Sequence, residues 1–462
     1  MQVAPSPAPR IAEVDISGPA RALAILRWSD YVLVVVCGYM ALGLLFELVS
    51  NGAEDAASMV FDLVYLSVLA FAAHTGWRHL GTIDPKVWRA YKVVFPLLLL
   101  LAAIVIGSFI ATRPASDDSI DRHTFVGLFV LAWVATMSLP AFIAVMLLPR
   151  MRLASIDMRL STLLEQVRRR GGDAGVHLTG LKRINPLRGT LFAAAGLLVI
   201  VAVMLAPEPA DEKLAGSTAR MGPQLSLIGF FLLLRARRHF QISADSLLAA
   251  DKRAPILFLR SFDDDEKQVF GAADRALLDF SLETRLANHF HRFGPFVAIG
   301  SPKESVPQLG AARVLLPDDQ WQERVLGWMR DAAAVVMYSG KTAWVNWELR
   351  QVIESGHAGR LILLIPEIKG RRSKTKKQDL RARVEQLRVV FKDTPWAEEL
   401  EAWRDFNGLR AMLFRLDGSM VMIKSRSKSR DSYHLAALVA HELLLAPVAV
   451  PELPAAAFLE AA

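Results

Sequence analysis

Apolar residues dominate the first half of the chain, in runs that recur at bilayer length. A helix needs about 20 apolar residues to cross a bilayer. Lipid offers the backbone no hydrogen-bond partners, so each such run is predicted to be helical. Six runs approach this length: Tyr31–Val49, Met59–Gly76, Val93–Ala111, Thr124–Leu148, Thr190–Ala206 and the shorter Pro223–Leu234. The pattern predicts an α-helical transmembrane bundle of about six spans within residues 31–240.

The segments between these runs alternate in charge, and the alternation predicts an orientation. Acidic residues gather in 51–58, 112–123 and 207–216, whereas arginine and lysine fill the other connections. Basic loops remain on the cytoplasmic side of a membrane. We therefore expect a multi-pass protein of the inner membrane with both termini in the cytoplasm. Residues 1–30 form its N-terminal cytoplasmic segment.

One basic connection, residues 150–188, contains an amphipathic pattern. Its apolar residues recur at helical spacing, with arginines on the other faces: Leu153, Ile156, Leu160, Leu163, Leu164 and Val167. Such a helix lies either on the inner surface of the membrane or against a soluble domain. The sequence leaves both alternatives open.

After a connector at 241–253, the pattern changes to short apolar strands alternating with amphipathic helices. The strands are "PILFLRSF", "PFVAIG", "AAVVMYS", "RLILLIPE" and a later one near "AMLFRL". A helix is expected around Asp379–Phe391, and "YHLAALVAHELLL" is the last one. Strand and helix in alternation predict a parallel sheet covered by helices. This cytosolic α/β domain spans 254–447 and is followed by a tail, 448–462.

Composition narrows the possible partners and chemistry. The formal net charge of +8 follows from basic loops beside anionic lipid. The basic runs 369–377 and 424–430 contain no aromatic residue for base stacking, so no nucleic-acid partner is predicted. The single cysteine, Cys37, excludes an intramolecular disulfide and a cysteine-based metal cluster. Glycine-rich phosphate loops are absent from the sequence.

Ligands of parallel α/β sheets bind outside the carboxyl ends of the strands. The residues that follow the predicted strands there are Arg260–Glu266, Gly300–Glu304, Ser339–Trp344 and Pro366–Glu367. Glu348 lies in the second turn of the helix after the third strand. On that helix Val345, Leu349 and Val352 form a buried stripe, which Trp344 and Glu348 flank. We expect the helix dipole to help keep the Glu348 carboxyl ionised.

Three motifs carry a resemblance to a known family: "LRSFDDDE", "WMRDAAAVVMYS" and "WVNWEL". With them the domain resembles a TIR (Toll/interleukin-1 receptor) domain, in the divergent form of bacterial membrane proteins, which has a flavodoxin-like sheet. The resemblance places Ser261 and Phe262 on the Ser and Tyr of the first box, and Glu348 on the catalytic glutamate. The chain departs from the family at Arg260 and at Val345, which replaces a cysteine. Nucleoside deoxyribosyltransferases are a more distant likeness.

The resemblance implies an enzyme that cleaves NAD, or a related nucleotide, at its N-glycosidic bond in stress or defence signalling. A carboxylate beneath the ribose stabilises the positive charge that develops there. We expect Glu348 to be catalytic, NAD to be a substrate rather than a cofactor, and no metal to be required. The expected substrate-binding residues are Arg260, Ser261, Phe262, Ser301, Ser339 and Trp344. The acids Asp263–Glu266 either bind a divalent cation or form a solvated loop or a helix N-cap.

The alternative is a non-catalytic signalling module. In this interpretation the TIR-like surface, including Ser301–Gly310, recruits a partner or self-associates, and the helices contact the lipid bilayer. A transporter is a third possibility, and the sequence argues against it. Only Glu47, Asp62 and His74 are ionisable within the predicted spans, and all three lie toward span ends.

Overall fold

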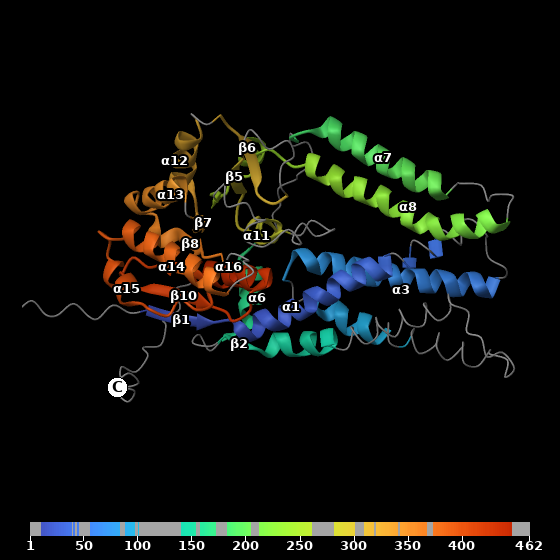
Figure 1. The fold of residues 1–462 in the computed structure, drawn as a ribbon, viewed down its shortest axis with the longest axis horizontal. Coiled ribbons are helices and arrows are strands. Elements are labelled where there is room, and N and C mark those ends of the chain that lie inside the picture. Colours follow the sequence, from blue (N-terminus) through green and yellow to red (C-terminus); the bar gives the residue numbers. More distant parts are fainter. Residues whose placement is uncertain are drawn as a thin grey trace, which may run out of the picture.

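The computed structural model has an α/β domain from which a group of long helices extends (Figure 1). The structure describes residues 11–38, 40–41, 44–45, 56–83, 88–97, 100, 140–153, 158–171, 183–204, 212–260, 281–300, 309–317, 320–340, 342–366 and 373–445.

An eight-stranded sheet forms the centre of the α/β domain, in the order β1-β10-β9-β8-β7-β4-β5-β6. Its strands are β1 (Ile11–Asp15), β4 (Ile256–Leu259), β5 (Phe296–Gly300), β6 (Ala312–Leu315), β7 (Ala334–Tyr338), β8 (Leu361–Leu364), β9 (Leu409–Phe414) and β10 (Met420–Lys424). The five strands from β8 to β6 are parallel, whereas β9 is antiparallel to both β8 and β10. The sheet is therefore mixed, and the prediction of a purely parallel sheet is wrong.

The antiparallel part of the sheet follows from a tight hairpin. Between β9 and β10 the chain turns at Asp417 and Gly418, and Gly418 has φ +83°. An Asp-Gly pair is a common hairpin signal because glycine adopts this conformation without strain. The strand β1 then adds to β10 in parallel. A segment expected to stand apart, residues 1–30, thus supplies a strand to the sheet.

Helices cover both faces of the sheet, as the β4 side chains show. Ile256 and Phe258 pack in one core with α1 (Ser17–Val32), α11 (Leu282–Phe290) and α16 (Arg430–Leu445). Leu257 and Leu259 pack in the other core. That second core contains α9 (Ala244–Ala250), α12 (Trp321–Asp331), α13 (Ala343–Glu354), α14 (Ser373–Val390) and α15 (Ala397–Ala402). A strand buried on both faces explains the continuous apolar runs in the sequence.

The remaining helices belong to the N-terminal half of the chain. They include the π-helical extension of α1, Leu33–Cys37, and α3 (Ala56–Gly81), α6 (Leu160–Arg170), α7 (Pro186–Met204) and α8 (Glu212–His239). Residues 88–97 and 140–147 are also helical. A small ribbon of β2 (Arg152–Leu153) and β3 (Met158–Arg159) precedes α6. The apolar face of α6 is buried, and Arg170 forms an ion pair of 2.5 Å with Glu442 of α16. Of the two alternatives for this amphipathic segment, packing on the domain is the one observed.

The expected bundle of about six membrane spans is wrong. Within the described residues, one helical segment, Pro186–Val203 of α7, is long and apolar enough to cross a membrane. The prediction of a multi-pass inner-membrane protein with both termini in the cytoplasm depended on that bundle and is therefore wrong as well. Several other apolar runs contribute to the same core as the sheet instead, through Cys37, Leu69, Phe95 and Val145. Much of Val93–Ala111 and Thr124–Leu148, and the end of Tyr31–Val49, lies outside the described residues.

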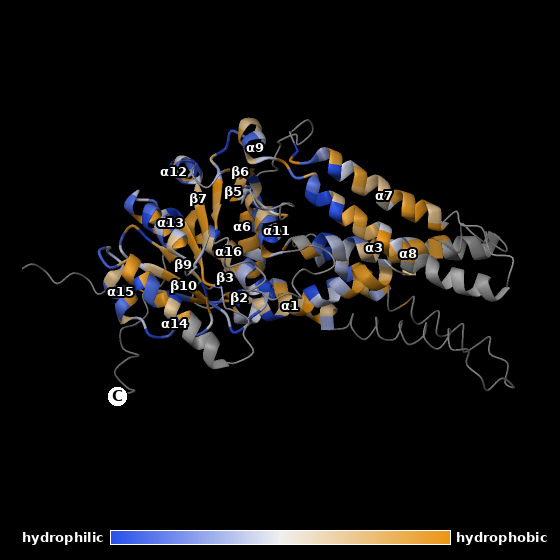
Figure 2. Cartoon of the chain, turned by 45° about the horizontal axis from the view of Figure 1, so that its top comes forward, coloured by the Kyte–Doolittle hydropathy of each residue, from blue (hydrophilic) through white to orange (hydrophobic). Residues whose placement is uncertain are grey.

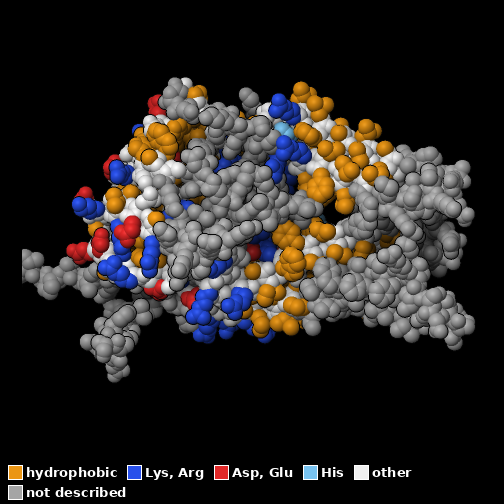
Figure 3. All heavy atoms as spheres, in the orientation of Figure 1, with side chains coloured by type: hydrophobic (Ala, Val, Ile, Leu, Met, Phe, Trp, Pro, Cys, Tyr) orange, Lys and Arg blue, Asp and Glu red, His pale blue; other side chains and the backbone are white. Residues whose placement is uncertain are grey.

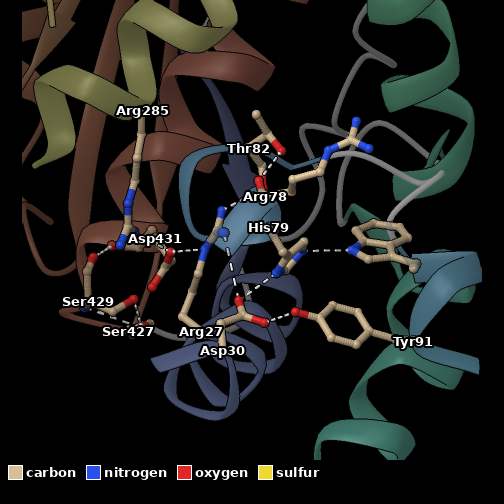
Figure 4. Close-up of polar contacts among 12 residues, drawn as sticks. Arg27, Asp30, Arg78, His79, Thr82, Tyr91, Arg285, Ser427, Ser429 and Asp431 are labelled. Carbon is tan, nitrogen blue, oxygen red and sulfur yellow. Dashed lines mark hydrogen bonds and ion pairs between the residues drawn. The ribbon is translucent and has the colours of Figure 1, made fainter. Parts of the chain in front are cut away.

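A buried network of polar side chains joins these N-terminal helices to the α/β domain (Figure 4). Asp431 of α16 accepts from Arg27 Nε at 3.0 Å and from Arg285 of α11 at 2.6 Å. On the other side of Arg27, Asp30 pairs with His79 Nδ1 at 2.6 Å and accepts from the Tyr91 hydroxyl. Buried charges are tolerated when they are paired in this way. The network fixes α1 and α3 relative to α11 and α16.

Candidate functional site

Glu348 lies near the carboxyl edge of the parallel strands, on the helix that follows β7. The chain leaves β7 at Tyr338, and Thr342 caps α13 by accepting a hydrogen bond from the Val345 N–H at 3.4 Å. The amino end of α13 is thereby held at the strand ends, and Glu348 falls in its second turn. The neighbours of β7 are β4 and β8. In chain order, the five parallel strands β6-β5-β4-β7-β8 correspond to 3-2-1-4-5. This is the order of the other common doubly-wound arrangement rather than the predicted flavodoxin-like one, and its ligands bind where the strand order reverses, here between β4 and β7.

The Glu348 carboxyl is buried, and one of its oxygens has no partner among the described residues. Its side chain joins Val345, Leu349 and Val352 on the buried face of α13, with 7% of the residue exposed. Among the described residues, its Oε2 atom has no hydrogen-bond partner. Burial raises the pKa of Glu348 to about 8. The expectation that the helix dipole keeps this carboxyl ionised is therefore wrong, because desolvation outweighs the dipole and favours the protonated form at neutral pH.

A second buried oxygen lies at the same edge. Ser339 directly follows β7, and its N–H donates to the Leu364 carbonyl of β8 at 2.8 Å. Its hydroxyl is buried and has no hydrogen-bond partner within the part of the chain that the structure describes. The Ser339 carbonyl accepts from the buried guanidinium of Arg383 on α14. The predicted residues Ser339 and Glu348 thus both present buried polar groups near this edge of the sheet.

Arg383 was not predicted, although the sequence contains a signal for it. Leu380, Arg383, Val384 and Leu387 recur at helical spacing, so the arginine lies within the apolar stripe of α14. A charged residue in such a stripe is usually paired or hydrogen-bonded. Here the Arg383 guanidinium donates to the Ser339 carbonyl and so stabilises the turn between β7 and α13.

Trp344 does not form a wall beside the buried carboxyl. It is 57% exposed and packs edge-on against Trp321 of α12, with ring centroids 5.5 Å apart. Trp347 contacts the same ring at 5.4 Å. The three indoles form a partly exposed aromatic cluster on the outer side of α12 and α13.

Arg260 is directed toward the opposite face of the sheet. Its Nε atom lies 3.9 Å from the Glu283 carboxylate on α11, and Glu283 also accepts from Arg313 of β6 at 2.6 and 2.7 Å. Since α11 and α13 cover different faces, the structure does not bring Arg260 and Glu348 together. The pair with Glu283 holds Arg260 at the end of β4, on the α11 face of the sheet.

The other predicted site residues, Ser261, Phe262, Ser301 and the acids Asp263–Glu266, lie outside the described residues. Comparisons of the chain with protein families, with characterised proteins and with solved structures find no match. The TIR-like resemblance therefore rests on its three sequence motifs and remains a prediction.

One hollow among the described residues lies on the face opposite Glu348. It lies between α6, α11 and α16, and His289, His434 and Arg292 contribute to its lining. His289 Nε2 lies 3.2 Å from His441 Nδ1, and burial lowers the pKa of both, to about 4 for His441. These imidazoles are neutral at physiological pH. This pair could not be predicted from local patterns, because its two histidines are 152 positions apart.

Proposed function

We propose that the α/β domain hydrolyses the N-glycosidic bond of NAD or a related nucleotide, with Glu348 as the catalytic carboxyl. One observation carries the proposal: a buried glutamic acid without a partner among the described residues lies at the edge where α/β sheets bind ligands. Leaving such a group unpaired in the interior costs free energy. Strongly perturbed carboxyls of this kind cluster at functional sites.

The raised pKa is compatible with this chemistry. The nicotinamide ring of NAD is cationic, and an opposite charge close to a carboxyl favours its ionised form. Substrate binding would thus release the Glu348 proton to solvent. The carboxylate would then stabilise the positive charge on the ribose as the bond to nicotinamide breaks, or bond to the sugar carbon. Water supplies the hydroxyl that replaces nicotinamide, and its remaining proton is released. In this proposal the Ser339 hydroxyl, which has no hydrogen-bond partner among the described residues, binds a ribose hydroxyl.

The test is NAD consumption by the purified full-length chain, followed by chromatography of nicotinamide and ADP-ribose. Wild-type protein should release nicotinamide, and Glu348→Gln should lower the rate by about 100-fold or more, as does the loss of other transition-state contacts. Glu354→Gln is the matched control, because Glu354 is an exposed acid on the same helix. The kcat/KM of the wild type should increase with pH up to about 8, where the free carboxyl ionises.

Two results would contradict the proposal. An equal rate for wild type and Glu348→Gln would remove Glu348 from the mechanism. If self-associated wild-type protein leaves NAD and related nucleotides intact, the enzymatic function itself is refuted.

A second function, recruitment of a protein partner or self-association through the TIR-like surface, is favoured by the indole cluster of Trp321, Trp344 and Trp347. Exposed aromatic side chains are enriched at binding sites. In this case Trp344→Ala should abolish association in sedimentation experiments, whereas Glu348→Gln should leave it unchanged. Either function would serve the stress or defence signalling that the resemblance implies.

A further inference from the structure

The helices α7 and α8 form a hairpin whose outer surface is apolar. They extend side by side away from the sheet (Figure 1), and their apolar residues dominate this part of the chain (Figure 2). Leu198 is 69% exposed. Other exposed apolar side chains on the pair are Leu187, Leu191, Leu197, Val201, Leu225, Ile228 and Phe231. Contiguous apolar surface of this kind marks a binding site for protein or lipid.

Close backbone packing explains why the large side chains point outward. A Cβ atom on Gly196 would lie 2.7 Å from the Gly229 carbonyl oxygen, and one on Gly229 would lie 2.6 Å from the Gly196 carbonyl oxygen. The two helices therefore contact each other through glycine, as small residues allow in lipid-embedded helix pairs. The leucines, which would form the interface in water, are left facing outward.

The dimensions of α7 match a bilayer. Its apolar segment, Pro186–Val203, has 18 residues, and only 11% of it is buried. At 1.5 Å per residue it is about 27 Å long, close to the roughly 30 Å of a hydrocarbon core. A core helix of a soluble domain would be mostly buried, so this segment is not one.

Arginines gather at the end of the hairpin that joins the α/β domain. Arg188 of α7 and Arg235 and Arg237 of α8 are all exposed. Basic side chains lie between the apolar surface and the domain in Figure 3. Neither α7 nor residues 225–239 of α8 contain an acidic residue. Guanidinium groups bind phosphate oxygens strongly, and long basic side chains reach from apolar surfaces to headgroups.

We propose that the α7–α8 hairpin is seated in an anionic phospholipid bilayer, with its leucines among the acyl chains and Arg188, Arg235 and Arg237 at the phosphates. A second copy of the chain could cover the leucines, but it would bring a second set of arginines, and neither α7 nor residues 225–239 of α8 would supply an acidic residue to pair with them. Anionic lipid offers acyl chains to the leucines and phosphates to the arginines, so it matches both parts of this surface. The proposal is confined to this pair of helices and does not depend on catalysis at Glu348.

The first experiment measures lipid contact directly. A fluorophore is attached to a full-length Leu198→Cys variant, in which the natural Cys37 is buried, and the protein is reconstituted with brominated phospholipids. We expect strong quenching by bromine on the acyl chains. Leu416→Cys is the control, because Leu416 is 83% exposed on the α/β domain, and its label should not be quenched. An unquenched label at Leu198 would overturn the proposal, as would disulfide formation between copies of the unlabelled Leu198→Cys variant.

The second experiment tests the arginines. Vesicles of phosphatidylcholine alone and of phosphatidylcholine with phosphatidylglycerol compete for the full chain in a flotation assay. Replacement of Arg188, Arg235 and Arg237 by glutamine should lower the preference for the anionic vesicles by about fivefold for each arginine removed. Arg404→Gln, an exposed arginine on the domain, should not change it. An unchanged preference in the triple variant would refute the role of the arginines.

Discussion

Replacing the buried carboxyl of Glu348 by an amide should stabilise the fold in a pH-dependent way. The ordinary pKa of a glutamate is 4.5, and that of Glu348 in the folded protein is about 8. Between these values the unfolded chain has released a proton that the folded chain still holds. The contribution of Glu348 to the free energy of unfolding is therefore fully present below pH 4.5, is lost progressively as pH rises, and reaches its minimum above pH 8. Glutamine does not titrate, so Glu348→Gln lacks this loss.

The magnitude follows from the difference between the two pKa values. A difference of about 3.5 units corresponds to ~5 kcal/mol above pH 8, and to ~3 kcal/mol at pH 7, at about 1.4 kcal/mol per unit. The measurement is urea unfolding of the full chain, followed by tryptophan fluorescence, for wild type and variant at pH 4.5, 7 and 8.5. The stability difference between them should increase steadily with pH in favour of the variant.

Glu354→Gln provides the control, since this exposed carboxyl should change stability by a small amount that does not vary with pH. A wild-type and Glu348→Gln pair whose difference is the same at all three pH values would refute the reasoning. In that case the Glu348 carboxyl titrates normally, which would mean that it is solvent-accessible or ion-paired in the folded protein.

Two further predictions concern packing. Asp431→Asn should destabilise the protein by about 3–5 kcal/mol, because it leaves the buried guanidinium groups of Arg27 and Arg285 without their shared carboxylate. In the same urea assay the control Asp405→Asn, which weakens an exposed pair with Lys424, should destabilise it by about 1 kcal/mol or less. Equal losses of stability in the two variants would contradict this prediction. Gly196→Ala should separate α7 from α8, because its Cβ would lie 2.7 Å from the Gly229 oxygen. Faster proteolysis of the hairpin would report the separation, whereas Gly327→Ala, where nothing lies within 4 Å, should have no such effect.

The parallel part of the sheet could be predicted because its signal is local. The strands β4, β5, β7 and β8 are buried on both faces, so each is a short continuous apolar run bounded by polar residues. The strand β1 gives a weaker signal, because two of its five residues, Glu13 and Asp15, are acidic. Its partner β10 lies about 400 positions further along the chain. Pairing over that distance leaves no trace in local composition.

The membrane prediction failed because hydropathy does not distinguish two uses of an apolar helix. On α3, Leu69 and Ala72 are buried in the protein core while Phe71 between them is exposed. A hydropathy value averaged over a window of residues does not distinguish the buried positions from the exposed one. The distinction requires knowing which other helices cover the segment, and those come from distant parts of the sequence.

The candidate site was predicted in position but not in its electrostatics. Sequence placed Glu348 one turn into a helix at the edge of the sheet, and a helix dipole acts on that position. Burial depends on what covers α13, including α14, which comes later in the chain. The same helix supplies Arg383, which holds the Ser339 carbonyl. The pKa of the carboxyl was therefore beyond local reasoning, and the structure reverses its expected direction.

The last turns of α3 connect the hairpin to the buried charge network. Trp77 contacts Phe230 of α8, with centroids 6.4 Å apart, and the Arg237 guanidinium lies 6.0 Å from the Trp77 ring. Two residues later, His79 pairs with Asp30, and Arg27 donates to the Thr82 carbonyl before it reaches Asp431 on α16. A hairpin seated in lipid would thus contact the same helix end that this network fixes to the domain. Because α16 packs directly on β8 and β9, the network gives the hairpin a continuous, well-packed connection to the sheet that carries Glu348.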